Sequence, residues 1–128
     1  MSTSLYADTI LDELHHPQNN QPLTDFDVEF DATNASCGDG FKIQIKLDAS
    51  KEKIAAIGWQ GQGCAISTAA LSRISAKAVG AKINEVQNWG VTELLGVLGL
   101  TQIALGRQNC LLVGLTGIKR ALTQASQK

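Results

Sequence analysis

Hydrophobic and polar positions alternate in three stretches near the middle of the chain, and each stretch predicts a β-strand. The clearest runs over 41–47, where every second residue is apolar and Lys or Gln lies between. Less regular alternation marks 28–32 before it and 54–60 after it. Alternation of this kind is typical of a strand with one buried face. Because the connections are short, we expect an antiparallel meander with one covered face.

A second periodicity, with apolar residues every third or fourth position, predicts helices on both sides of these strands. The predicted helices cover 4–14, 64–78, 81–89, 92–100 and 110–122. In the first, Leu11 is expected on the buried face and Glu13 on the solvent face. In the last, Gly114 and Gly117 cost about 1 kcal/mol each relative to alanine. We explain these two glycines by close packing against the sheet.

Length and composition fit one domain of the α+β class. The chain has 128 residues, of which 44% are hydrophobic and 18% charged, which suits one core better than two. No apolar run approaches the ~20 residues of a membrane span, and the first residues lack the regions of a secretory signal. We expect a soluble, cytoplasmic domain over 1–128, a three-stranded antiparallel sheet packed against several helices, with no membrane partner.

Charge is distributed unevenly along the chain, although the net charge is only −1. Residues 1–41 hold eight acids and no Lys or Arg, and residues 42–128 hold eleven bases against four acids. Neutralisation of one part by the other within the fold is the simpler interpretation. An acidic face that steers a basic partner is the functional one. No stretch has the basic, aromatic-interleaved composition of a nucleic-acid binder, so no nucleic-acid partner is expected.

Three cysteines and one aspartate are the candidate chemistry of the chain. Cys37 and Asp39 stand two residues apart, Cys64 lies where a predicted strand gives way to a helix, and Cys110 begins the last helix. Three cysteines cannot all pair within one chain, which favours a reducing compartment. Three thiolates suit Zn²⁺ or an iron–sulfur cluster. A carboxylate as fourth ligand would make one corner of such a site more exchangeable.

Spacing alone leaves other interpretations open. A single buried cysteine is most often a small hydrophobe, and gaps of 26 residues (37 to 64) and 45 residues (64 to 110) match no paired zinc knuckle. The glycines within 58–63 could cradle a phosphate, but the Lys-Ser/Thr of a P-loop is missing. A cysteine hydrolase needs a histidine base, and a helix end explains His15 and His16. A zinc-stabilised binding module without sulfur chemistry also stays open.

At these residues the chain resembles the U-type iron–sulfur cluster assembly scaffolds, the family of IscU, SufU and NifU N-terminal domains. The resemblance covers nearly the whole chain. The matching motifs are His16-Pro17-Gln18-Asn19, Cys37-Gly38-Asp39, Gly63-Cys64-Ala65-Ile66-Ser67 and Cys110 before an apolar helix.

The resemblance implies an α+β fold with a three-stranded antiparallel sheet and a metal site at one end. It implies that Cys37, Asp39, Cys64 and Cys110 bind iron or a nascent [2Fe–2S] cluster, or Zn²⁺ in the isolated protein. The cysteines would accept persulfide sulfur from a cysteine desulfurase, and recipient apo iron–sulfur proteins would take the cluster. Such a scaffold is not an enzyme in the usual sense. The alternative function is a zinc-dependent sulfurtransfer partner of the desulfurase, without a physiological cluster.

The chain departs from the family pattern at positions that distinguish the IscU branch from the SufU branch. IscU proteins carry a histidine where this chain has Asn109, and a Leu-Pro-Pro-Val-Lys motif is missing from 103–107, which puts Hsp70-type chaperone handling in question. Arg107 resembles the SufU pattern, but the chain has no room for the SufU insert between the second and third cysteines. Gln18 replaces the usual arginine after His-Pro. Together these features indicate a SufU-like variant that lacks the insert.

Overall fold

The three expected strands form one antiparallel sheet, in the order in which they follow along the chain. In the computed structural model, which describes residues 10–34, 38–100 and 108–126, the sheet has the order β1-β2-β3. Its strands are β1 (Val28–Asn34), β2 (Asp39–Leu47) and β3 (Ile54–Gln62). Both pairings are antiparallel. The predicted meander is therefore confirmed.

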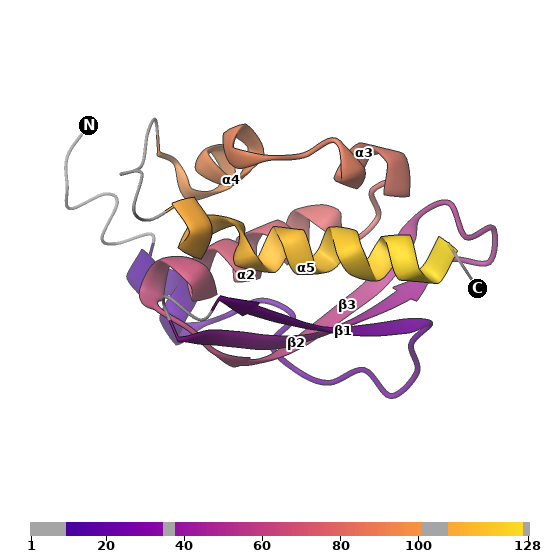
Figure 1. Cartoon of the computed structure of the whole chain (residues 1–128), viewed down its shortest axis with the longest axis horizontal. Helices are drawn as coiled ribbons and strands as arrows, with labels where there is room; N and C mark the ends of the chain where they lie inside the picture. The colour runs from indigo at the N-terminus through magenta and orange to yellow at the C-terminus, as the bar shows by residue number, and fades with distance from the viewer. Residues whose placement is uncertain (1–9, 35–37, 101–107, 127–128) are drawn as a thin grey trace.

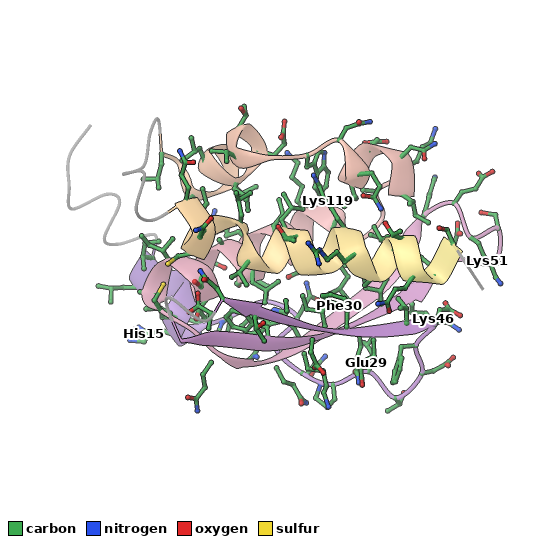
Figure 2. All side chains as sticks on the ribbon, in the orientation of Figure 1. His15, Glu29, Phe30, Lys46, Lys51 and Lys119 are labelled. Carbon is green, nitrogen blue, oxygen red and sulfur yellow. The ribbon has the colours of Figure 1, made fainter. Side chains whose placement is uncertain are left out.

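Helices cover one face of the sheet (Figure 1). Residues 21–23 lie over part of the other face, where the backbone N–H of Leu23 donates to Gln44 Oε1 at 2.8 Å. The apolar residues of β2 are buried at every second position, as expected for a strand with one covered face. On β1, Phe30 packs against the core while Glu29 is exposed (Figure 2). The α+β prediction is confirmed by this two-layer arrangement.

Four helices follow β3 among the described residues. They are α2 (Ala65–Ala78), α3 (Ile83–Gln87), α4 (Val91–Leu98) and α5 (Gln108–Ser126). α5 lies against β1 and β2, α2 packs beside it, and α4 contacts both of these helices (Figure 1). None of the described helices combines the length and hydropathy that a bilayer crossing requires.

The limits of the helices differ from those expected. α3 and α4 are shorter than predicted, and α4 ends where Gly99 takes a φ of 72°. α5 continues to Ser126, beyond its last predicted residue. Of the first predicted helix, residues 10–14 are helical and the helix extends one residue further, to His15, while residues 4–9 lie outside the described ranges.

The two glycines inside α5 mark close contacts of different kinds. A Cβ on Gly117 would lie 2.7 Å from atoms of Ala32 and Ile43, so here α5 touches the sheet as expected. A Cβ on Gly114 would instead lie 2.8 Å from Cδ1 of Leu71 on α2. The prediction of sheet packing is therefore wrong for Gly114, which brings two helices together.

The helical segment 10–15 reverses two expected orientations. Leu11 is 51% exposed, whereas Glu13, expected in solvent, is only 4% exposed. The Glu13 carboxylate accepts hydrogen bonds from Ser72 Oγ at 2.6 Å and from Arg73 Nε at 2.8 Å. Both donors belong to α2, and a buried carboxylate requires such partners. The prediction that Glu13 faces solvent is wrong because a distant part of the chain supplies these partners.

Ion pairs support internal neutralisation of the uneven charge. Lys46 lies 3.0 Å from Asp25 and 4.0 Å from Asp27, and Arg73 lies 2.8 Å from Glu13. Each pair joins an acid from the first 41 residues to a base from the remainder of the chain. The acids concentrated in residues 1–41 are therefore partly neutralised within the fold by bases from later in the chain.

Candidate metal centre

Three of the four predicted ligands meet at one end of the sheet. One ligand atom from each of Asp39, Cys64 and Cys110 lies within 4.8 Å of the others. Asp39 is the first residue of β2, Cys64 directly precedes α2, and Cys110 is the third residue of α5. Segments separated by 24 and 45 intervening positions (39 to 64 and 64 to 110) therefore bring their ligand atoms together.

Two glycines let the end of β3 and the residue after it pass close to the start of β2. A Cβ on Gly63 would lie 2.6 Å from Cζ of Phe41 and 2.8 Å from Oδ1 of Asp39. Gly61 takes a φ of 136°, a conformation that L side chains rarely adopt. The close approach of this segment to β2 depends on these two glycines.

Cys64 is the N-cap of α2, as its position between strand and helix suggested. Its Sγ accepts a hydrogen bond from the backbone N–H of Ser67 at 3.5 Å and lies 3.1 Å from Ser67 Oγ. Backbone donors at a helix N-terminus favour negative charge. The position therefore suits a sulfur ligand that carries such charge.

The Asp39 carboxylate is buried, and both of its oxygens accept hydrogen bonds. Oδ1 accepts from the backbone N–H of Cys64 at 2.8 Å, and Oδ2 accepts from Ser67 Oγ at 2.5 Å. These bonds tie the start of β2 to the first turn of α2. Ser67 is thus part of the site, although sequence reasoning did not single it out. A serine in the first turn of a helix is common, so its position alone carried no signal.

Cys110 is buried at the start of α5, on the helix predicted to carry it. It is disulfide-bonded in this structure. Metal binding through Cys110 therefore concerns the reduced protein, since the thiolate is the ligand form. Cys37 and Arg107 also lie outside the described residues, so their predicted roles stay predictions.

The donor set fits a soft metal ion. Zn²⁺ takes sulfur ligands at about 2.3 Å and carboxylate oxygens at about 2.0–2.2 Å, so tetrahedral ligand atoms lie roughly 3.4–3.8 Å apart. The three groups, within 4.8 Å of one another, need to approach by only about 1 Å to reach such a geometry. Two sulfurs and one oxygen leave one tetrahedral corner for a further ligand.

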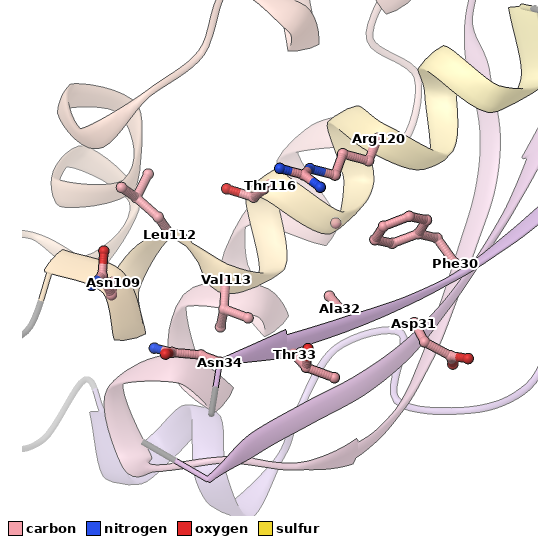
Figure 3. A pocket seen from close by; sticks show the side chains of 11 residues that line it. Phe30, Asp31, Ala32, Thr33, Asn34, Asn109, Leu112, Val113, Thr116 and Arg120 are labelled. Carbon is pink, nitrogen blue, oxygen red and sulfur yellow. The ribbon is translucent and has the colours of Figure 1, made fainter. Parts of the chain in front are cut away.

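A pocket lies beside the three grouped ligands, between the edge strand β1 and α5 (Figure 3). Its volume is about 380 Å³, and its lining includes Phe30, Asn34, Asn109 and Arg120. Asn109 and Val113 of this lining flank Cys110 along α5. None of the three grouped ligands lines the pocket. The candidate centre is therefore a compact cluster at the sheet end, with the pocket as its neighbour.

Comparison with known sequences finds one matching family model and two curated relatives. The family model of the NifU-like N terminal domain matches residues 5–128. The zinc-dependent sulfurtransferase SufU of Bacillus subtilis is 33% identical over 72 residues, 56% of this chain and 47% of that protein. The iron–sulfur cluster assembly scaffold protein IscU of Thermotoga maritima is 29% identical over 82 residues, 64% of this chain and 56% of that protein. The match thus spans about half the length of these curated relatives.

Solved structures show the same fold. The NifU-like protein (N-terminal) from Brucella abortus has a TM-score of 0.81 at 14% identity, over 97% of this chain and 96% of that one. A putative iron–sulfur cluster assembly scaffold protein for the SUF system from Fervidobacterium islandicum has a TM-score of 0.76 at 20% identity, over 95% and 99%. With the family match over nearly all residues, the chain belongs to the NifU-like N-terminal domain family, the U-type scaffold family that its motifs indicated.

Proposed function

We propose that this protein is a scaffold on which an iron–sulfur cluster is assembled and from which it is passed to recipient apo-proteins. The observation that carries the proposal is the convergence of Asp39, Cys64 and Cys110 at one sheet end, in a chain of the U-type family. Cys37, Cys64 and Cys110 would be ligands and sulfur acceptors, and Asp39 the exchangeable ligand. The cluster, of the [2Fe–2S] type, is cargo, and Zn²⁺ would occupy the site in the isolated protein.

The hydrogen bonds of Asp39 support its role as the exchangeable corner. A carboxylate that gives up a metal in a buried site is normally left without a partner, which costs free energy. Here the N–H of Cys64 and the hydroxyl of Ser67 lie within hydrogen-bond distance of its two oxygens. Release of the cargo would therefore leave Asp39 with protein donors.

Sulfur would arrive by exchange with the persulfide of a cysteine desulfurase. A scaffold thiolate attacks the terminal sulfur of that persulfide, a new S–S bond forms, and the desulfurase cysteine leaves as a thiolate without net oxidation. Cys64 is partly exposed, whereas Cys110 is buried. Among these two, Cys64 is the accessible acceptor. The proposal includes a reducing cytoplasm, where these thiols stay available.

Anaerobic reconstitution of the reduced protein with iron and sulfide tests the scaffold function. The wild type should develop the visible charge-transfer absorption of an iron–sulfur cluster, and Cys64→Ser should lose most of it because one thiolate ligand is missing. A double variant, Cys64→Ser with Ser50→Cys, restores the number of thiols at an exposed turn far from the site. It should stay colourless, and a colourless wild type would contradict the proposal.

The alternative function, a zinc-dependent sulfurtransfer partner without a physiological cluster, is favoured by the name of the SufU relative. The two functions differ in what zinc does to turnover of an added cysteine desulfurase. For a scaffold, removal of zinc should leave sulfur acceptance on Cys64 intact, measured by persulfide mapping in mass spectra. Stimulation that requires zinc, together with no cluster after reconstitution, would replace the scaffold with the sulfurtransfer function.

A further inference from the structure

One buried hydroxyl connects two of the proposed ligands. Ser67 is 0% exposed, and its Oγ lies 2.5 Å from Asp39 Oδ2 and 3.1 Å from Cys64 Sγ. We propose that Ser67 is a positioning residue, whose hydroxyl fixes Asp39 and Cys64 relative to each other and slows release of the bound metal. This inference rests on the proposed function, because it takes Asp39 and Cys64 as ligands.

The direction of the shorter hydrogen bond follows from the donors available. A hydroxyl carries one proton, and an ionised carboxylate only accepts. At 2.5 Å the Ser67 hydroxyl therefore donates to Asp39, an O–H···O⁻ distance typical of a charge-assisted bond. The same oxygen then faces Cys64 Sγ. A single atom thus sets the spacing between the carboxylate and the sulfur.

Two hydrogen bonds hold the carboxylate of Asp39. The bond from the Ser67 hydroxyl is the one that a side-chain substitution can remove. The other comes from the backbone N–H of Cys64. Without the Ser67 hydroxyl, the carboxylate can rotate about its side-chain bonds while it keeps one hydrogen bond. The backbone N–H of Ser67, which donates to Cys64 Sγ, is unaffected by Ser67→Ala. The variant therefore loosens the ligand pair without removing the N-cap of α2.

A second buried serine on the same helix provides a matched control. Ser75 is also 0% exposed, but its hydroxyl donates to the carbonyl of Ser72 and accepts from Asn19 Nδ2. Neither partner is a proposed ligand. Ser67→Ala and Ser75→Ala thus remove the same group from the same helix, and only the first change touches Asp39 and Cys64.

The experiment measures release of zinc from reduced, zinc-loaded protein to a chromophoric chelator. Changes to groups that orient metal ligands typically cost 10–100-fold in affinity. We expect Ser67→Ala to release zinc about 10-fold faster than the wild type, and Ser75→Ala to match the wild type. As a second measurement, Co²⁺ should give altered visible ligand-field bands in Ser67→Ala and unaltered bands in Ser75→Ala.

The outcomes separate this inference from the proposed function. Wild-type release rates and bands in Ser67→Ala would overturn the positioning role while leaving the metal site intact. Equal acceleration in both serine variants would also overturn it, because general loosening of α2 would then explain the effect. A wild type that binds no zinc would instead contradict the proposed ligand set.

Discussion

Gly61→Ala should destabilise the fold by about 3 kcal/mol or more, because two costs fall on one position. The new Cβ would lie 2.1 Å from the carbonyl oxygen of Gly40 and 2.8 Å from Cα of Phe41. Both contacts are backbone atoms of β2, which cannot move aside like the end of a flexible side chain. The φ of 136° is also unfavourable for alanine. Urea denaturation of the reduced, metal-free protein measures the loss.

Gly40→Ala is the control for this prediction, since it changes the facing strand by the same methyl group. No atom lies within 4 Å of a Cβ at Gly40, and its φ is not in the left-handed region. Its free energy of unfolding should stay within about 1 kcal/mol of the wild type. Equal midpoints for Gly61→Ala and the wild type would mean that β2 and β3 do not approach as closely beside the site as this structure shows.

The sheet and the helical layer followed from periodicity because burial imposes it. Strand β2 shows the link directly, since its alternating residues are the ones buried under the helices. The ends of helices are harder to predict from hydrophobic periodicity. Three of the last four residues of α5, Thr123, Gln124 and Ser126, are polar and exposed, so they add little to an apolar stripe, yet the helix continues through them. Periodicity detects the face that packs and misses turns that face water.

Glu13 shows why polarity alone misplaces some residues. A helical stripe sorts residues into apolar and polar sets, and Glu13 belongs to the polar set by composition. Its burial depends on Ser72 and Arg73, which lie 59 and 60 positions later. Nothing local in the sequence indicates that pairing, so the structure was needed to find it.

The candidate site likewise contains residues that the sequence indicated and one that only the structure shows. Cysteines at predicted strand and helix ends, two of them next to glycines, indicated a shared site, and the structure brings Asp39, Cys64 and Cys110 together. Ser67 carried no comparable signal, since its partner Asp39 is 28 positions away. Only the fold shows that its hydroxyl faces that carboxylate. The resemblance indicated the family, and the structure shows the residue whose hydroxyl lies between two of the proposed ligands.

Glu13→Gln should lower the free energy of unfolding near neutral pH by about 3 kcal/mol. The glutamine amide keeps the volume of the side chain but replaces one accepting oxygen with an NH₂ group, which then faces groups that themselves donate hydrogen bonds. Ser72, Arg73 and Gln18 all donate to the carboxylate in the wild type. Breaking one partner of a buried ion pair typically costs about 3–5 kcal/mol. The lower end applies because the Arg73 side chain is 36% exposed and can still be hydrated.

The effect should depend on pH in a direction set by the pKa of Glu13. Burial raises this pKa, but hydrogen bonds from Ser72, Gln18 and Arg73, with the charge of Arg73, outweigh burial, so the folded pKa lies below the ordinary 4.5. Ionised Glu13 therefore stabilises the fold above the unfolded value, and this contribution is lost as pH falls through the folded pKa. Urea midpoints of wild type and Glu13→Gln should converge as the pH is lowered from neutral through this range.

Glu93→Gln separates this effect from a general loss of carboxylate hydrogen bonds. Glu93 also has a lowered pKa, chiefly because the backbone N–H of Gly90 donates to it. It caps α4 at the surface and forms no buried ion pair with any residue that the structure describes. Its replacement should cost clearly less than that of Glu13 at neutral pH. Equal losses in the two variants, or a Glu13→Gln deficit that stays constant into acid, would show that the bond between residues 10–15 and α2 is not electrostatic. The fold would then join its first helical segment to α2 by packing alone, and the buried carboxylate would be a consequence of that packing instead of its cause.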